Sequence, residues 1–146
     1  MTVRILPCRL AHLRAVAPNL RAEERIELEA VGLKPRHALI DLWRETIGPR
    51  AAVKGDDVLA VWGDMAPPLA REGRLWMATT LAVERAPITF ARVAQAELRR
   101  MLVSRETIRC SVAMSCTRAL RFAAMLGFEV IEDTVRLGFI DLRLAR

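Results

Sequence analysis

Apolar residues recur at three- and four-residue spacing in five segments of the chain, which is typical of amphipathic helices. A proline opens two of these segments and a glycine follows three of them, as expected at helix starts and ends. The predicted helices cover residues 9–16, 21–31, 35–47, 87–103 and 117–126.

Other segments are apolar in short continuous or alternating runs bounded by turn residues, which indicates strands. The second strand of a predicted hairpin, Val58 to Trp62, is apolar at every position and should be buried on both faces. The predicted strands cover residues 3–6, 50–53, 58–62, 75–83, 108–114, 128–131 and 135–144.

This order of elements predicts an α/β fold with a mixed sheet and helices on both faces. Antiparallel strands dominate the N-terminal half, and a βαβαβ arrangement follows in the C-terminal half. No repeat or flexible linker divides the sequence, so we expect residues 1–146 to form a single domain with its own core.

The composition is apolar for a globular protein, at 53% hydrophobic residues and a mean hydropathy of +0.19. It argues against disorder and leaves room for an apolar surface that binds a partner. No run is long enough to span a membrane, and the N-terminus lacks the pattern of a secretion signal, so we expect a cytoplasmic protein.

Basic residues outnumber acidic ones, 23 to 17, giving a net charge of +6. They are spread along the chain without interleaved aromatic residues, so nucleic-acid binding is a minor alternative. Three cysteines and two histidines follow no metal-binding spacing, and we expect no metal site.

The segment from Cys116 to Phe128 resembles the GNAT (Gcn5-related N-acetyltransferase) pattern N-x-x-A-x-x-x-Y-x-x-x-G-F. Ala119, Gly127 and Phe128 match it, and the predicted element order is similar to the GNAT order. The resemblance implies a GNAT-like fold. It also implies contacts to acetyl-CoA from the positions occupied by Thr79, Thr80, Leu81, Arg85, Thr89 and Cys116.

Two functional elements of the GNAT pattern are missing. Ala123 stands where many GNAT enzymes have the tyrosine that protonates the leaving thiolate, and the chain contains no tyrosine at all. The glycine-rich loop that holds the pyrophosphate is replaced by residues 81–89, which contain no glycine and include Glu84 and Pro87. No catalytic residue is therefore assigned.

The sequence is also similar to a phage branch of this superfamily, the small internal virion proteins of short-tailed, T7-like phages. The shared landmarks lie between about residues 20 and 130. They are the acidic helix before Gly32 and Pro35, Trp62-Gly63, residues 73–80, residues 87–90 and Leu126-Gly127-Phe128. This resemblance implies a catalytically degenerate protein of virion assembly or of the phage particle, in the host cytoplasm or the virion, with other virion proteins as partners and no cofactor.

Two alternatives stay open beside the virion role: an acyltransferase that uses acetyl-CoA, and a nucleic-acid-associated module. Trp76 and Phe90 could stack on a cofactor, but core packing is the favoured interpretation. Glu23, Glu24 and Glu27 could supply a general base, but a solvated helix face is favoured. Cys116 could be a nucleophile, but a structural thiol is favoured.

Overall fold

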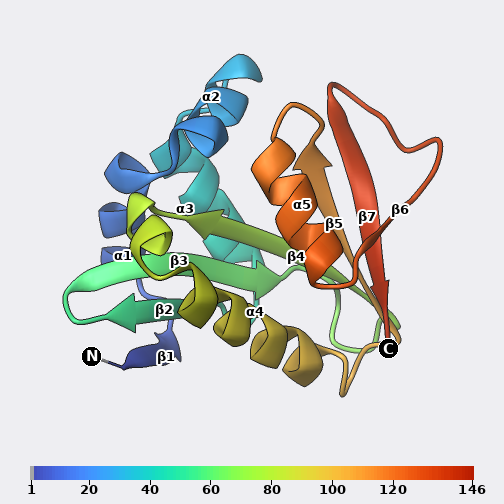
Figure 1. The fold of residues 1–146 in the computed structure, drawn as a ribbon, viewed down its shortest axis with the longest axis horizontal. Coiled ribbons are helices and arrows are strands. Elements are labelled where there is room, and N and C mark those ends of the chain that lie inside the picture. Colours follow the sequence, from blue (N-terminus) through green and yellow to red (C-terminus); the bar gives the residue numbers. More distant parts are fainter. Residues whose placement is uncertain (1) are drawn as a thin grey trace. The chain divides into compact units, whose positions relative to one another are not determined.

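The computed structural model of the protein describes residues 2–146 (Figure 1). Its α-helices are α1 (Leu10–Val16), α2 (Ala22–Ala30), α3 (Pro35–Glu45), α4 (Pro87–Met101) and α5 (Thr117–Met125), and its 3-10 helices are η1 (Ala17–Asn19) and η2 (Leu81–Arg85). Its strands are β1 (Val3–Pro7), β2 (Arg50–Lys54), β3 (Asp57–Asp64), β4 (Glu72–Thr79), β5 (Thr107–Ala113), β6 (Glu129–Val130) and β7 (Phe139–Ala145).

The strands form one seven-stranded mixed sheet in the order β1-β2-β3-β4-β5-β7-β6. β1 pairs with β2 and β2 with β3 in antiparallel fashion, whereas β4 and β5 are parallel. β7 lies between β5 and β6 and is antiparallel to both. A parallel pair needs a long crossover connection, and α4 supplies it between β4 and β5.

The chain divides into two compact units, each described here by itself. The first consists of residues 1–65 and 76–91, and the second of residues 66–75 and 92–146. β4 and α4 each contribute residues to both units.

In the first unit, the core lies between strands β1 to β4 and helices α1 and α3. Leu13 and Val16 of α1 and Leu39 of α3 pack with Val61 of β3 and Trp76 of β4. The sequence places apolar residues at this spacing on each helix because one face of the helix must be buried. Trp76 and Phe90 are both buried, as predicted.

In the second unit, α4 and α5 pack on the apolar face of β5 and β7. Leu98 of α4 and Ala123 of α5 contact the same cluster as Ile108 and Leu142 of the strands. α5 ends at Met125, and the turn that follows it contains Gly127, whose φ of 101° strongly favours glycine. The N–H groups of Gly127 and Phe128 donate to the carbonyls of Ala124 and Ala123, which is a Schellman motif.

Several predicted boundaries were wrong, among them the start of the last strand, which is Phe139 and not Val135. The strand predicted over 75–83 starts earlier and ends at Thr79, because the hydroxyl and N–H of Thr80 bond to carbonyls of β3 and the chain then turns into η2. The predicted N-cap of α5, Thr117, is its first helical residue, and Cys116 occupies the N-cap position.

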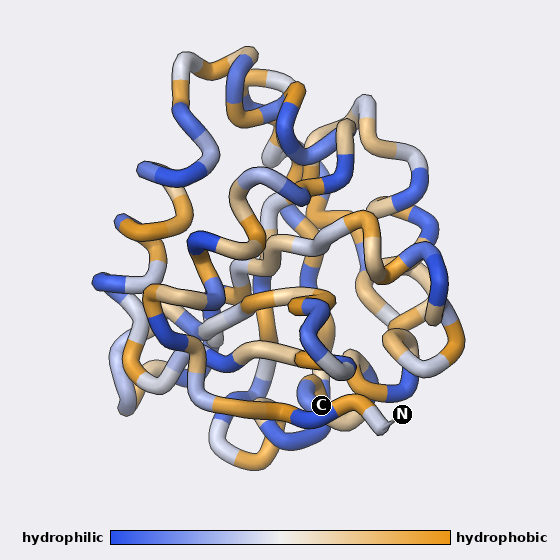
Figure 2. The backbone as a smooth tube through the Cα atoms, turned by 90° about the vertical axis from the view of Figure 1, so that its left-hand side faces the viewer, coloured by the Kyte–Doolittle hydropathy of each residue, from blue (hydrophilic) through white to orange (hydrophobic). Residues whose placement is uncertain are grey.

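Apolar and polar residues alternate along the chain in short stretches (Figure 2). None of the helices in residues 2–146 is both long and apolar enough to cross a membrane.

Candidate active site

A carboxylate from α2 is bound at the end of β4. The backbone N–H of Thr79 donates to Oε1 and Oε2 of Glu24 at 3.1 and 3.3 Å, and the Thr79 hydroxyl donates to Oε2 at 2.9 Å. Thr79 is buried, and Glu24 is half-buried. Contacts across 55 residues of sequence therefore fix this acidic side chain at the strand end.

The pKa of the Glu24 carboxyl is raised above its ordinary value. Burial disfavours its charged form and raises its pKa to about 7, with a smaller contribution from the like charge of Glu27. The two hydrogen bonds from Thr79 and the charge of Arg21 act in the opposite direction, because they favour the ionised form. A carboxyl group that titrates near neutrality can both accept and release a proton at physiological pH.

The segment leading into α2 runs beside the end of β4. Leu20 and Thr80 form an antiparallel bridge, and the N–H of Arg21 donates to the carbonyl of Thr79 at 3.3 Å. The Arg21 guanidinium lies 3.6 Å from Glu84, so its direct ion pair is with Glu84. Both backbone groups of Thr79 are thus engaged by the 20–24 segment.

The backbone groups of Thr79 and of Thr80, the residue after β4, point to opposite edges of the strand. Thr80 donates its N–H to Leu59 of β3 at 3.0 Å, and successive residues of an extended strand direct their backbone groups to opposite sides. The N–H and C=O of Thr79 therefore lie on the edge away from β3, and those of Met77 lie on the same edge. Met77 is a site candidate that the sequence analysis missed.

The segment in place of the glycine-rich loop is helix η2, followed directly by the start of α4. In η2 and at its end, the N–H groups of Val83 and Ala86 donate to carbonyls three residues earlier. The α4 start differs: helix geometry leaves the N–H groups of Ile88 and Thr89 without an intrahelical acceptor, and both residues are exposed. This end of α4 can bind an anion.

Arg85 lies two residues before α4 and adds positive charge there. Its guanidinium forms a 3.5 Å ion pair with Asp57, and both side chains are largely exposed, at 75% and 61%. Such a surface pair is weak, so Arg85 can exchange Asp57 for a phosphate. Leu81 is also exposed, at 52%, and presents an apolar side chain in the same segment.

Of the predicted cofactor residues, Thr79, Thr80, Leu81, Arg85 and Thr89 all fall in the first unit, between the end of β4 and the start of α4. Cys116 falls in the second unit, where it is 5% exposed at the N-cap of α5. Ala123, at the position of the GNAT tyrosine, is packed in the second core. The sequence analysis favoured a solvated helix face for Glu24, and this interpretation was wrong, because the side chain is half-buried against Thr79.

Other polar groups have structural explanations. Nδ1 of His12 accepts the N–H of Arg9 at 2.9 Å as part of a capping box at α1. Burial raises the pKa of Cys8 to about 11 and that of Cys110 to about 12, which makes both thiols poor nucleophiles. Among the described residues, no three His, Cys, Asp or Glu side chains gather as metal ligands.

No protein-family model and no curated protein sequence matches the chain. Solved structures do match it over nearly its whole length. The GNAT domain of S. lividans PAT has a TM-score of 0.73 at 13% identity, covering 99% of this chain and 90% of that chain. PaiA N-acetyltransferase from Thermoplasma acidophilum, in complex with coenzyme A, has a TM-score of 0.72 at 14% identity, covering 100% of both chains. A GNAT-family acetyltransferase from Bacillus anthracis has a TM-score of 0.71 at 9% identity, covering 99% of this chain and 95% of that chain. Similarity at this level of identity concerns the fold, and it confirms the mixed α/β fold of the GNAT N-acetyltransferases for this chain.

Proposed function

We propose that the protein is a CoA-dependent N-acyltransferase in which Glu24 accepts the proton of the amine substrate. The observation that carries this proposal is the carboxylate held at the end of β4 by Thr79, with its pKa raised to about 7. The fold supports it, because the solved structures named above include N-acetyltransferases, one of them with coenzyme A bound. Fold alone does not imply function, so the residues around Glu24 carry the proposal.

The phosphate end of coenzyme A fits the start of α4. The N–H groups of the exposed residues Ile88 and Thr89 and the exposed guanidinium of Arg85 supply donors and positive charge in one segment. Glu84 is the negative charge closest in sequence, and its ion pair with Arg21 offsets it. Met77 has backbone groups on the edge of β4 that can bond to an extended chain such as pantetheine.

Glu24 provides the chemistry on the acceptor side. When bound, the thioester supplies the acyl group, to which the amine nitrogen forms a C–N bond as the C–S bond breaks and the sulfur leaves as a thiolate. The proton lost by the nitrogen passes to a carboxylate oxygen of Glu24. Because the chain contains no tyrosine and Ala123 is apolar, solvent is the proposed source of the proton for the thiolate.

Binding is tested first, by thermal unfolding with acetyl-CoA. A ligand at 100 times its dissociation constant should stabilise the protein by about 2.7 kcal/mol, which is a shift of several degrees in Tm. Arg85→Ala should weaken binding, whereas Arg14→Ala, at an exposed arginine of α1, should not. No shift at millimolar acetyl-CoA would contradict the proposal.

Catalysis is tested by the release of the CoA thiol in the presence of a panel of primary amines: an amino acid, a polyamine, and peptides with a free α-amine or a lysine. Glu24→Gln should lower kcat/KM by about a hundredfold or more with the best of them. Glu29→Gln, at an exposed position of the same helix, is the matched control. Equal activity in wild type and Glu24→Gln would remove Glu24 from the reaction.

The virion role that the phage resemblance implies stays a prediction. It is tested separately, by looking for the protein in purified particles, and it does not depend on acyl transfer.

A further inference from the structure

The contact between Thr79 and Glu24 is more specific than packing requires. Thr79 offers two donors, its backbone N–H and its hydroxyl, and both are directed at one carboxylate. The strand end is fixed in turn, because Thr79 accepts the N–H of Arg21 and Thr80 forms a bridge with Leu20. Glu24 and Thr79 are therefore held together both by their own hydrogen bonds and by backbone contacts between segments 20–24 and 79–80.

We infer that Thr79 is the positioning residue for Glu24: its two donors fix the orientation of the carboxylate at the end of β4 and keep it ready to accept a proton. This inference rests on the proposed function for its catalytic consequence. Its structural part, the control of Glu24 by Thr79, can be measured without any ligand.

The hydrogen-bond count leaves room for a substrate. An ionised carboxylate has about four acceptor sites, and the two donors of Thr79 occupy about half of them. The remaining sites on Glu24 can accept hydrogen bonds from an amine while Thr79 still holds the side chain.

The charge around Glu24 favours a cationic acceptor. Both donors from Thr79 are neutral groups, and the nearest cation, Arg21, pairs directly with Glu84. The negative charge of Glu24 is thus not cancelled by a contacting cation. An amine that arrives protonated would supply that cation; it would lose one proton to solvent before it attacks, so that Glu24 stays ionised and accepts the proton released as the C–N bond forms.

The test is a titration of the Glu24 carboxyl by ¹³C NMR in wild type, Thr79→Val and Thr79→Ser. Valine keeps the shape of threonine and the backbone N–H but removes the hydroxyl, so the ionised form of Glu24 loses one hydrogen bond. We expect the pKa of Glu24 to rise above its wild-type value by about half a unit or more in Thr79→Val, and to stay close to wild type in Thr79→Ser. An unchanged pKa in Thr79→Val would overturn the inference.

A second measurement covers the case in which Thr79→Val does not fold. In the wild-type protein, the amide proton of Thr79 should shift with pH and report the same apparent pKa as the Glu24 carboxyl, because the two groups are bonded. An amide that does not follow the carboxyl would overturn the inference as well.

Activity provides the link to function. In Thr79→Val, the lower pH limit of kcat/KM should move upward with the pKa of Glu24, and Thr79→Ser should restore it. A loss of activity at all pH values without that movement would assign Thr79 a merely structural role. Absence of acetyl-CoA binding in the wild type would contradict the proposed function and leave the NMR result standing.

Discussion

The indole N–H of Trp76 donates to the hydroxyl of Thr46 at 2.7 Å, and this bond joins β4 to the residue that follows α3. Both residues are buried, and the Thr46 hydroxyl in turn donates to the carbonyl of Leu42 at 2.7 Å. The hydroxyl thus serves as acceptor and donor at once inside the first unit.

Thr46→Val should destabilise the protein by about 1–3 kcal/mol, because the buried indole N–H loses its acceptor. Urea unfolding followed by tryptophan fluorescence measures this cost. Thr46→Ser keeps the hydroxyl and should retain more of the stability than Thr46→Val. Equal losses in the two variants would mean that packing of the methyl group, and not the hydrogen bond, matters at this position.

Gly63→Ala should also destabilise the first unit, by about 1–3 kcal/mol. A Cβ atom at Gly63 would collide with Cγ2 of Thr46 and would lie 2.9 Å from the indole nitrogen of Trp76. Because Thr46→Ser removes Cγ2, we expect the double variant to lose less stability than the sum of the two single variants. Strict additivity in this double-mutant cycle would contradict the predicted collision.

Glu24 should make folding stability depend on pH between about 4.5 and 7. Its folded pKa of about 7 lies above the ordinary value of 4.5, so in this window the folded state binds more protons than the unfolded state. Stability from this group therefore falls as the pH rises from 4.5 to 7, by up to about 3 kcal/mol. The difference in unfolding free energy between wild type and Glu24→Gln, measured across this window, isolates the effect.

The exposed Glu29 provides the control for that measurement. Glu29→Gln should leave the pH dependence parallel to that of wild type. A Glu24→Gln curve that is also parallel to wild type would show that the pKa of Glu24 is not raised in the folded state.

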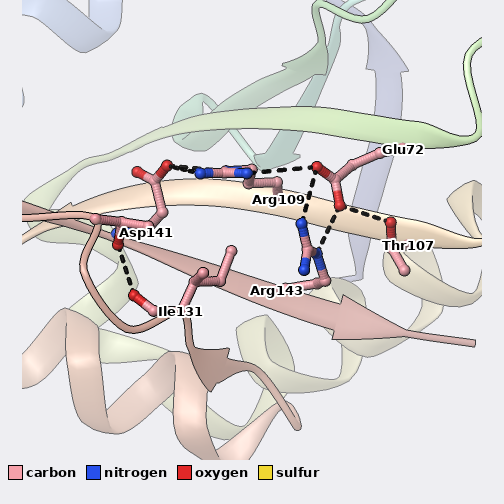
Figure 3. Close-up of polar contacts among 7 residues, drawn as sticks. Glu72, Thr107, Arg109, Ile131, Asp141 and Arg143 are labelled. Carbon is pink, nitrogen blue, oxygen red and sulfur yellow. Dashed lines mark hydrogen bonds and ion pairs between the residues drawn. The ribbon is translucent and has the colours of Figure 1, made fainter.

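Glu72 should make folding stability depend on pH in the direction opposite to that of Glu24. A hydrogen bond from Arg143 and further contacts from Thr107 and Arg109 lower its pKa in the folded protein (Figure 3). Its contribution to stability is therefore present above pH 4.5 and is lost as the pH falls through the folded pKa. Arg143→Gln should weaken the protein at pH 7 and make less difference in acid, as measured by thermal unfolding at both pH values.

The order of helices and strands could be predicted from the sequence because the apolar spacing changes where the element type changes. The end of β4 could not, since Thr79 and Thr80, the two polar residues in the run from Leu75 to Val83, also suit a strand, and contacts with β3 stop the strand at Thr79. The burial of Glu24 against Thr79 could not be predicted, because the two residues lie 55 positions apart in the sequence. One signal was present: Glu24 lies midway between Leu20 and Leu28 at four-residue spacing, which places a charge on an apolar stripe.

The polar face of the second unit has a consequence for folding accuracy. Thr107 and Arg109 of β5 share that face with Asp141 and Arg143 of β7, whereas Ile108 and Leu142 point into the core. Arg109 donates to Asp141 at 2.6 and 2.8 Å, and Arg143 donates to Glu72 at 2.7 Å (Figure 3).

A slip of either strand by one residue would move these arginines into the apolar cluster and expose the isoleucine and leucine. The arginines on this face therefore favour the correct register of β5 and β7, because a shifted pairing would bury their charges in the apolar cluster. Each ion pair is partly exposed to solvent, so the pairs add less to the stability of the correctly paired sheet than they cost a misaligned one.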